Sequence, residues 1–190
     1  MSTLKKENEL KESIRRYLKT YNDFPKPGVR FKDIQSLLMF PNINRMVIES
    51  MQKSIKEADL KPDVILAFDA RGFLYGGMYA YMYGIPLIMA RKKGKLPGKL
   101  VTQVFEKEYG QDEISVQSGL IKPGMRVLIH DDLLATGGTS EAAAKIILNQ
   151  GGIIEGFHFL IELEYLSGRK ILEEFKSPII SIINFVNPED

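Results

Sequence analysis

The sequence predicts an α/β fold with a doubly wound, mainly parallel open sheet flanked by helices. Four short, nearly continuous apolar runs are typical of strands buried on both faces, and they lie at residues 64–68, 85–90, 126–130 and 156–163. Helix-like stretches at 73–83 and 139–150 lie between these runs. Such alternation predicts a parallel sheet, and ligands of parallel sheets bind at the carboxyl ends of the strands. The residues that follow each run are therefore the first candidates for a site.

Two further helices are expected before the first strand. Residues 1–20 predict an amphipathic helix, because apolar side chains repeat there at helical spacing; they are Leu10, Ile14, Tyr17 and Leu18. The segment FPKPG then ends this helix, since two prolines and a glycine do not continue one. Asn42 is expected to cap a second helix. The apolar stripe of that helix consists of Ile43, Met46, Val47 and Ile55.

Residues 92–118 form a long polar connection, which is unusual inside a compact domain unless it is functional or disordered. Short pieces of alternating polarity lie within it, around 101–105 and 114–117. We predict a mobile two-stranded flap for this segment. Residues 1–190 are expected to form a single domain, in which residues 1–40 make a small N-terminal unit.

Composition excludes several classes of protein. The 26 basic and 24 acidic residues nearly balance, so net charge gives no argument for binding nucleic acid or a membrane. The absence of cysteine excludes disulfides, thiolate metal sites and a catalytic thiol, and two histidines exclude a histidine-rich metal site. No apolar signal core or membrane span is found, so we expect a soluble, cytoplasmic protein. Both histidines, His130 and His158, are expected in the core.

The segment RVLIHDDLLATGGTSEAAAKII carries the strongest chemical signal. We expect a buried strand to present Asp131 and Asp132 at its carboxyl end, followed by a tight turn and a helix. Glycines allow close backbone approach, and the amino end of a helix attracts phosphate. The turn consists of Ala135, Thr136, Gly137, Gly138 and Thr139. Carboxylates beside a phosphate cradle suggest a phosphorylated sugar between them, although the acids of a plain strand-turn-helix unit could also merely cap the helix.

At this point a family resemblance becomes clear. HDDLLATGGTS resembles the 5-phosphoribosyl-1-diphosphate (PRPP) motif of the type I phosphoribosyltransferases. FPKPGVRFKDI resembles the purine-binding segment of the adenine phosphoribosyltransferases, and DARGFLYG resembles their DSRGFLFG. RKKGKLPGKL, EYG and LIELEYLSGRKIL resemble further family motifs, in the same order along the chain. The resemblance implies the type I phosphoribosyltransferase fold and purine salvage, in which adenine and PRPP give AMP and diphosphate.

The resemblance also implies roles for cations at the strand ends, where they suit a multiply charged leaving group. Arg71 is implied as a catalytic residue, after a cis peptide between Asp69 and Ala70, where the family usually has serine in place of Ala70. The expected diphosphate-binding residues are Asp69, Ala70, Arg71, Arg91, Lys92 and Lys95. Lys93 and Lys99 are expected to face solvent.

For the base, the resemblance implies that the purine packs against Phe31 and that the backbone of Arg30 reads the adenine edge. Lys32 completes the implied adenine-binding segment. The family usually has an apolar residue in place of Arg30 and often arginine in place of Lys32. On the flap, Glu108 is implied as the catalytic residue that manages the purine proton. Tyr109 follows it, and Lys107 replaces a common leucine.

Magnesium is the expected cofactor, because it binds through few carboxylates and many phosphate oxygens. It would be held mainly through PRPP, with help from Asp131 and Asp132. The family is typically homodimeric, and neither nucleic acid nor membrane is expected as a partner. Two alternatives remain, namely a phosphoribosyltransferase for a 6-oxopurine and a non-catalytic regulator that senses PRPP. The second needs an added DNA-binding module, which about one helix before the purine segment does not supply.

Overall fold

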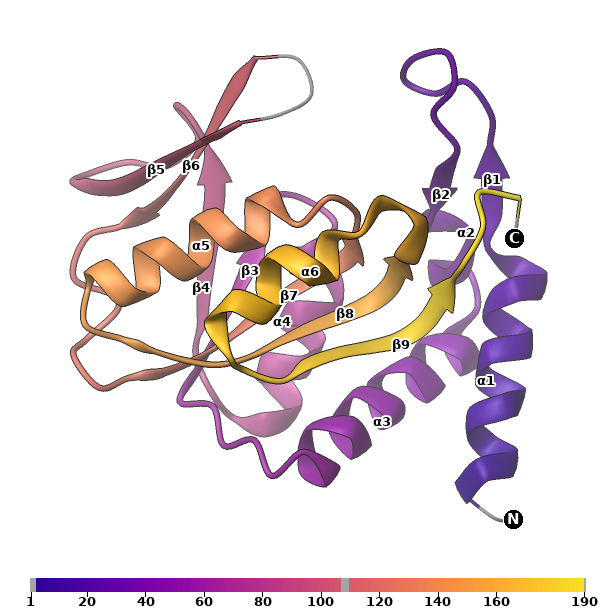
Figure 1. Cartoon of the computed structure of the whole chain (residues 1–190). Coiled ribbons are helices and arrows are strands. Elements are labelled where there is room, and N and C mark those ends of the chain that lie inside the picture. The colour runs from indigo at the N-terminus through magenta and orange to yellow at the C-terminus, as the bar shows by residue number, and fades with distance from the viewer. Residues whose placement is uncertain (1–2, 107–109, 190) are drawn as a thin grey trace.

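A seven-stranded sheet forms the centre of the computed structural model of the chain, which describes residues 3–106 and 110–189 (Figure 1). Its strands, in spatial order, are β5 (Leu100–Glu106), β6 (Gln111–Gln117), β4 (Leu87–Lys92), β3 (Val64–Phe68), β7 (Arg126–Leu134), β8 (Ile153–Leu163) and β9 (Ile179–Phe185). The five strands from β4 to β9 run parallel, and β6 joins β4 antiparallel. The predicted mainly parallel α/β fold is thus confirmed.

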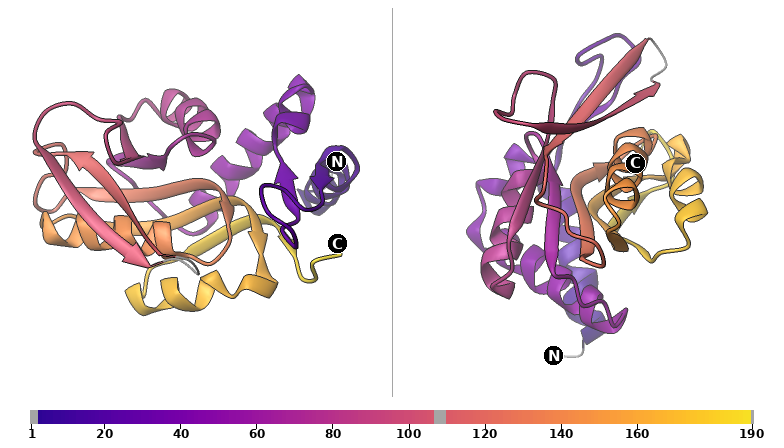
Figure 2. Two further views of the ribbon diagram at one scale, coloured as in Figure 1. Left: turned by 90° about the horizontal axis from the view of Figure 1, so that it is seen from above. Right: turned by 90° about the vertical axis from the view of Figure 1, so that its left-hand side faces the viewer.

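Helices cover both faces of this sheet (Figures 1 and 2). One face carries α1 (Thr3–Tyr17), α3 (Pro41–Glu57) and α4 (Gly72–Tyr83), and the other carries α5 (Gly138–Asn149) and α6 (Gly168–Leu172). Strand β3 shows how the two cores form, because successive side chains of a strand point to opposite faces. Ile65 and Ala67 join the cluster under α3 and α4, whereas Leu66 joins the cluster under α5.

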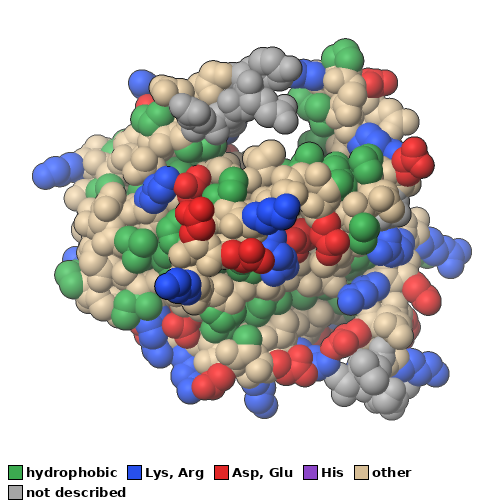
Figure 3. All heavy atoms as spheres, in the orientation of Figure 1, with side chains coloured by type: hydrophobic (Ala, Val, Ile, Leu, Met, Phe, Trp, Pro, Cys, Tyr) green, Lys and Arg blue, Asp and Glu red, His purple; other side chains and the backbone are tan. Residues whose placement is uncertain are grey.

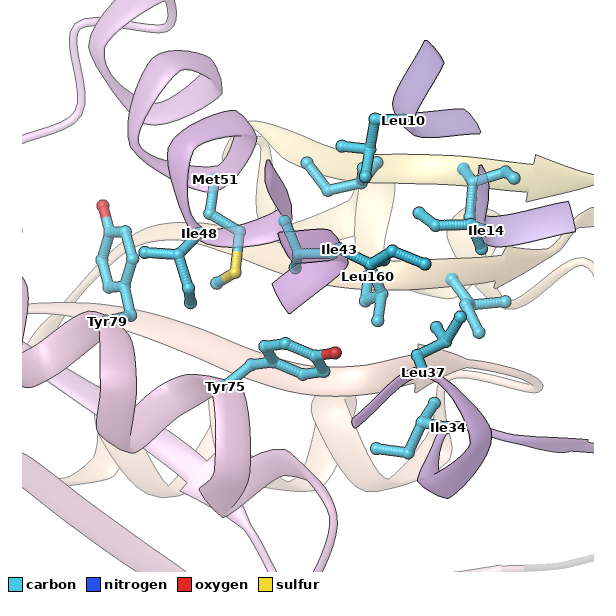
Figure 4. Close-up of a cluster of buried hydrophobic side chains, with 14 of the residues drawn as sticks. Leu10, Ile14, Ile34, Leu37, Ile43, Ile48, Met51, Tyr75, Tyr79 and Leu160 are labelled. Carbon is cyan, nitrogen blue, oxygen red and sulfur yellow. The ribbon is translucent and has the colours of Figure 1, made fainter. Parts of the chain in front are cut away.

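The larger core cluster ties the first third of the chain to the sheet (Figure 4). Leu10 and Ile14 of α1 are buried, as the helical spacing predicts. They pack in the same cluster as Met51 of α3 and Tyr75 of α4. His130 and His158 are also buried, at 1% and 0% exposure, so their expected place in the core is confirmed.

A separate two-stranded sheet, formed by β1 (Lys19–Tyr21) and β2 (Phe31–Asp33), stands beside the carboxyl edge of the main sheet. We call residues 19–33 the hood. Short α2 (Gln35–Leu38) connects it to α3. Helix α1 is tied to the last strand, since an Arg15 guanidinium nitrogen donates to the Asn184 carbonyl at 3.1 Å. The hood and the β5–β6 hairpin project from the same edge of the molecule (Figure 1).

Several predicted boundaries were wrong. Helix α3 begins at Pro41 with Phe40 as its N-cap, so Asn42 lies inside the helix and does not cap it. Strand β4 extends through Arg91 and Lys92, because both pair with β6. Strand β7 continues past the expected end at His130, because Asp131, Leu133 and Leu134 pair with β8. The acidic pair therefore lies within a strand, beyond the last residue of β7 that pairs with β3.

The predicted flap is a hairpin of β5 and β6, paired from Leu100 with Gln117 to Glu106 with Gln111. Its two-stranded form is confirmed, and its mobility remains a prediction. The sequence-based prediction omitted β1, β2, α6 and β9. Within residues 3–106 and 110–189, none of the helices combines the length and the apolar character that crossing a bilayer requires.

Candidate active site

The carboxyl ends of β3, β4 and β7 meet between the hood and the flap hairpin, because β3 pairs in parallel with both neighbours. This arrangement brings together Asp69 to Arg71 after β3, Lys92 at the end of β4, and the acidic pair of β7. The surface beside the hood is hollowed at this edge (Figure 3). Most of the predicted site residues thus lie along one edge of the sheet.

The acidic pair, Asp131 and Asp132, forms the floor of the site. The Asp132 N–H donates to Oδ1 of Asp131 at 2.9 Å, and the Asp132 residue is only 3% exposed. Burial raises the pKa of Asp131 well above its ordinary value, and the neighbouring charge of Asp132 raises it further. Burial also raises the pKa of Asp132, while Arg71 opposes this effect. Carboxyl groups in such surroundings favour a ligand that brings hydroxyl donors or a cation.

Arg71 connects the acidic pair to the hood. Its Nη2 atom lies 2.9 Å from Oδ2 of Asp132, and its Nη1 atom donates to the Lys32 carbonyl at 3.0 Å. The guanidinium also lies 4.8 Å from the centre of the Phe31 ring, within the range of a cation–π contact. One side chain therefore links the acidic pair to the aromatic ring of the hood.

The first turn of α4 approaches the acidic pair closely. The Asp69–Ala70 peptide bond is cis, as the family resemblance implies. Two residues later, a Cβ atom added to Gly72 would lie 2.6 Å from Oδ1 of Asp131. Glycine at this position therefore allows the helix to start directly against the carboxylate.

The loop from Ala135 to Thr139 leads from β7 into α5. Gly137 occupies the N-cap position with a φ of 86°, a conformation that glycine adopts without steric cost. No side chain among the described residues caps α5 at this position. The backbone N–H groups of the first helical turn are thereby left to a ligand, and the positive end of the helix dipole suits an anion.

Two cavities lie on either side of this loop. The larger, of about 430 Å³, is enclosed by the hood, Arg71, the loop and the C-terminal region. Its wall consists of Gly28, Val29, Arg30, Phe31, Lys32, Arg71, Leu133, Ala135, Thr136, Leu163, Tyr165, Leu166 and Pro188. The smaller, of about 140 Å³, lies under the flap hairpin between Asp69, Lys92, Asp112, Asp131 and Thr139. The apolar and aromatic lining of the larger cavity suits a flat base. The smaller cavity combines three carboxylates with Lys92, which suits an anion bound together with a cation.

Some predicted residues are engaged elsewhere. Arg91 pairs with Asp69, with Nε 2.9 Å from Oδ2, and donates from Nη1 to the Lys95 carbonyl at 3.1 Å. The Lys95 side chain is exposed on the turn after β4. The Lys32 ammonium lies 4.1 Å from the centre of the Phe185 ring, so this side chain anchors the hood to β9. The backbone of Lys32, through its contact with Arg71, is the part nearer the acidic pair.

The predicted catalytic residue Glu108, with Tyr109 and Lys107, lies outside the described residues. Sequence reasoning missed Asp112 on the flap and Tyr165 and Pro188 on the C-terminal side, all of which line cavities. Tyr165 falls within LIELEYLSGRKIL, a family motif for which the sequence predicts no specific role. Asp112 and Pro188 carry no local signal, because only the tertiary fold brings them to the site.

Comparisons with known proteins agree with this geometry. A family model for the phosphoribosyl transferase domain matches residues 33–170. The adenine phosphoribosyltransferase of Desulfitobacterium hafniense is 44% identical over 170 residues, which cover 90% of this chain and 96% of the relative. The crystal structure of the Thermoanaerobacter pseudethanolicus adenine phosphoribosyltransferase superposes with a TM-score of 0.87 at 41% identity, covering 92% of this chain and 99% of that one. The Saccharomyces cerevisiae enzyme, complexed with adenine and an imino-altritol bisphosphate, gives 0.86 at 31% identity, covering 93% and 99%.

Proposed function

The chain belongs to the adenine phosphoribosyltransferase family, and from this premise we propose how its residues perform the family's reaction. The enzyme transfers a phosphoribosyl group from PRPP to adenine, giving AMP and diphosphate. The observation that carries the proposed arrangement is the pair of cavities beside the acidic pair and the uncapped loop. One edge of the sheet thereby offers places for base, sugar, phosphate and leaving group.

The sugar and its 5′-phosphate bind at the end of β7. Asp131 and Asp132 accept hydrogen bonds from the ribose hydroxyls, which provide donors to one half-buried and one buried carboxyl group. The backbone N–H groups of Ala135 to Thr139, with the hydroxyls of Thr136 and Thr139, hold the phosphate. The uncapped start of α5 supports this role.

The diphosphate binds on the flap side of the acidic pair. Asp69 and Ala70 supply backbone groups after β3, and Arg71, whose side chain lines the larger cavity, supplies positive charge from the hood side. Arg91, Lys92 and Lys95 supply positive charge from the end of β4 and its turn. Lys92 has the most direct support, because it lines the smaller cavity with its Nζ atom 3.6 Å from Oδ2 of Asp112. Cations placed here stabilise the charge that develops as the diphosphate leaves.

Adenine binds in the larger cavity, with Phe31 as its aromatic wall. The backbone of Arg30 reads the edge of the base, and the buried Lys32 stem holds this part of the hood against Phe185. A site that hydrogen-bonds the adenine amino group rejects 6-oxopurines by up to about 10⁴-fold, because buried polar groups would be left unpaired.

The chemical step has a transition state resembling an oxocarbenium ion, as in glycoside hydrolysis. The hood orients the purine, the acidic pair and loop orient the ribose, and Arg71 with Lys92 stabilises the leaving diphosphate. Glu108 acts as the acid–base residue for the proton of the attacking base. Closure of the flap (residues 92–118) excludes water, which would otherwise hydrolyse the activated sugar.

Magnesium fits the same edge. Asp131 and Asp132 offer oxygen donors beside Thr139 and the smaller cavity, and the ion prefers few carboxylates with many phosphate oxygens. A cation here would also compensate the burial of two adjacent carboxylates. When bound, it neutralises charge on the diphosphate; the substrate supplies most of its ligands.

We also propose a homodimer in the cytoplasm. Leu74, Met78, Tyr81 and Met82 of α4 are exposed and repeat at helical spacing, which places them in one apolar stripe. Exposed apolar stripes of this kind mark protein interfaces.

The cytoplasm is proposed because PRPP, a multiply charged substrate, does not cross a membrane unaided.

The test is a substrate panel. Purified enzyme with PRPP and Mg²⁺ should form a nucleotide from adenine and not from hypoxanthine, guanine or xanthine. The Glu108→Ala variant should lose most of the turnover, because proton transfer by a positioned side chain contributes about 10²- to 10⁴-fold. Unchanged turnover in this variant would remove Glu108 from the mechanism, and turnover of a 6-oxopurine would refute the proposed reading of the base.

A further inference from the structure

Behind the phosphate loop lies a polar cluster around one buried carboxylate, and none of the roles above uses it. Glu162 of β8 is 2% exposed and receives two hydrogen bonds from Arg169, from Nε at 2.9 Å and from Nη2 at 2.6 Å. The Ser181 hydroxyl of β9 donates to the same carboxylate at 2.6 Å. Arg169 also donates to the Ile179 carbonyl at 3.0 Å. We call Glu162, Arg169 and Ser181 the clamp.

The clamp holds the residue on which the phosphate loop rests. Gly168 precedes Arg169 and starts α6. A Cβ atom added to Gly168 would lie 2.1 Å from the Ala135 carbonyl oxygen and 2.8 Å from the Gly137 nitrogen. In return, a Cβ atom on Gly137 would lie 2.7 Å from the Gly168 carbonyl oxygen. The two segments therefore touch backbone to backbone, with no side chain between them to absorb a shift.

We propose that Glu162, Arg169 and Ser181 are positioning residues for the 5′-phosphate of the substrate and product. The inference rests on the proposed role of the loop. The bidentate pair fixes Arg169 to β8 and β9, and thereby fixes Gly168 beneath Ala135 and Gly137. The loop is then held in its binding conformation before the phosphate arrives, which lowers the entropy cost of binding.

This role differs from a purely structural one in what it predicts. A structural pair would change stability and leave the affinity for phosphate unaltered. A positioning cluster affects ligands that carry the 5′-phosphate more than adenine, because the hood residues Gly28 to Lys32 form a separate part of the adenine cavity wall. Ribose 5-phosphate is the sharpest probe, because it contacts the loop and the acidic pair without base or diphosphate.

The experiment compares Glu162→Gln, Arg169→Lys and Arg169→Gln with Arg126→Gln as the matched control. Arg126 makes a similar bidentate pair with Asp63, at 2.7 and 3.1 Å, at the amino end of β7 and away from the loop. For each variant we would measure the thermal midpoint, the Kd of ribose 5-phosphate, the KM values of PRPP and adenine, and kcat.

We expect Glu162→Gln and Arg169→Gln to raise the Kd of ribose 5-phosphate and the KM of PRPP about tenfold, equivalent to about 1.4 kcal/mol. The KM of adenine and kcat should stay within about twofold of wild type. The corresponding free-energy change is much smaller than that of losing one good hydrogen bond to a charged group. For Arg169→Lys, the Kd of ribose 5-phosphate and the KM of PRPP should lie between those of wild type and of Arg169→Gln, because lysine keeps the charge without the planar fork.

Unchanged Kd and KM values in folded Glu162→Gln, with a lower thermal midpoint only, would overturn the proposal. An equal rise in Arg126→Gln would also overturn it, since the effect would then be general destabilisation. If the wild-type enzyme bound ribose 5-phosphate but formed no AMP, the proposed function would fail and the clamp could still be judged from the binding data.

Discussion

At the scale of single residues, two neighbouring lysines, Lys92 at the end of β4 and Lys93 after it, offer a matched comparison. Lys92 lines the smaller cavity, whereas the side chain of Lys93 is 82% exposed and lies 3.7 Å from Glu113. Exposed ion pairs contribute about 0–1 kcal/mol, so the Lys93 pair is of little consequence. The difference between the two positions is therefore contact with the proposed diphosphate.

We expect Lys92→Ala to raise the KM of PRPP about tenfold, which is the loss of one charge-assisted hydrogen bond at a partly screened site. Lys93→Ala should remain within about twofold of wild type because its charge is solvated. Steady-state kinetics with varied PRPP at saturating adenine would measure both. Equal effects of the two substitutions would show that only the overall charge of the turn matters.

His130 makes the stability of the fold depend on pH. Burial lowers the pKa of His130 to about 4 from its ordinary 6.5. Between these values the unfolded chain binds a proton that the folded protein does not, so the contribution is complete above pH 6.5 and is lost as pH falls towards 4. The loss from His130 between pH 7 and pH 5 is about 2 kcal/mol.

The measurement is urea unfolding of wild type and His130→Val at pH 7 and pH 5. The variant should lose about 2 kcal/mol less than wild type over this interval. The raised pKa values of Asp131 and Asp132 act in the opposite direction, but they are present in both proteins and cancel in the comparison. Parallel losses in the two proteins would mean that His130 is already protonated or accessible in the folded state.

At the scale of elements, two of the three glycines of α4 allow different close contacts. A Cβ at Gly72 would meet Oδ1 of Asp131 at 2.6 Å, whereas a Cβ at Gly76 would meet the Ala67 Cβ at 2.9 Å and the His130 Cδ2 at 3.1 Å. The first glycine adjoins the site and the second adjoins the core. Both contacts are fixed by the packing of α4 on β3 and β7.

Gly72→Ala should displace the Asp131 carboxylate and lower kcat/KM for PRPP by about 10²-fold, the cost of misplacing a group by about 1 Å. Gly76→Ala should lower the free energy of unfolding by about 1–3 kcal/mol through overpacking, and with it the thermal midpoint. The KM of PRPP should stay unaltered. Kinetics and thermal unfolding of the two variants side by side would separate these effects. A normal kcat/KM in Gly72→Ala would show that the carboxylate moves aside without consequence.

Periodicity predicted the existence of the main helices and strands better than their limits. The runs at 64–68 and 126–130 identified β3 and β7 because strands buried on both faces carry few polar residues. The extensions to Lys92 and Asp132 could not be predicted, since pairing with β6 and β8, and not side-chain polarity, keeps those residues in strands. Strand β9 was missed although IISIINF carries the same apolar signal.

The candidate site, like the fold, was predicted only in part. The acidic pair, the loop and the segment FPKPGVRFKDI were identified from local motifs, and the structure brings them to one edge. The Arg71 contacts with Phe31 and Asp132, and the cavity walls at Asp112 and Pro188, join segments far apart in the chain. No local pattern carries such contacts.

At the scale of the whole molecule, the exposed stripe of α4 predicts a dimer. Tyr81 is 88% exposed and lies within the stripe of Leu74, Met78 and Met82. In a sedimentation experiment the wild type is expected to have the mass of two chains. Tyr81→Glu should have the mass of one chain, because burying an unpaired charge opposes association. Leu148→Glu is the control, since Leu148 is 50% exposed on α5 at the opposite face. A monomeric wild type would refute the proposed dimer.

The larger cavity has walls from both ends of the described chain, with Gly28 on one side and Pro188 on the other. In the language of folding, it is built from contacts of very high sequence separation, and forming such contacts costs loop-closure entropy. A nucleotide that fills it binds only chains in which the hood has already docked on β9 through Lys32 and Phe185. Occupancy therefore reports completed folding, and by mass action the product stabilises the finished fold as a whole.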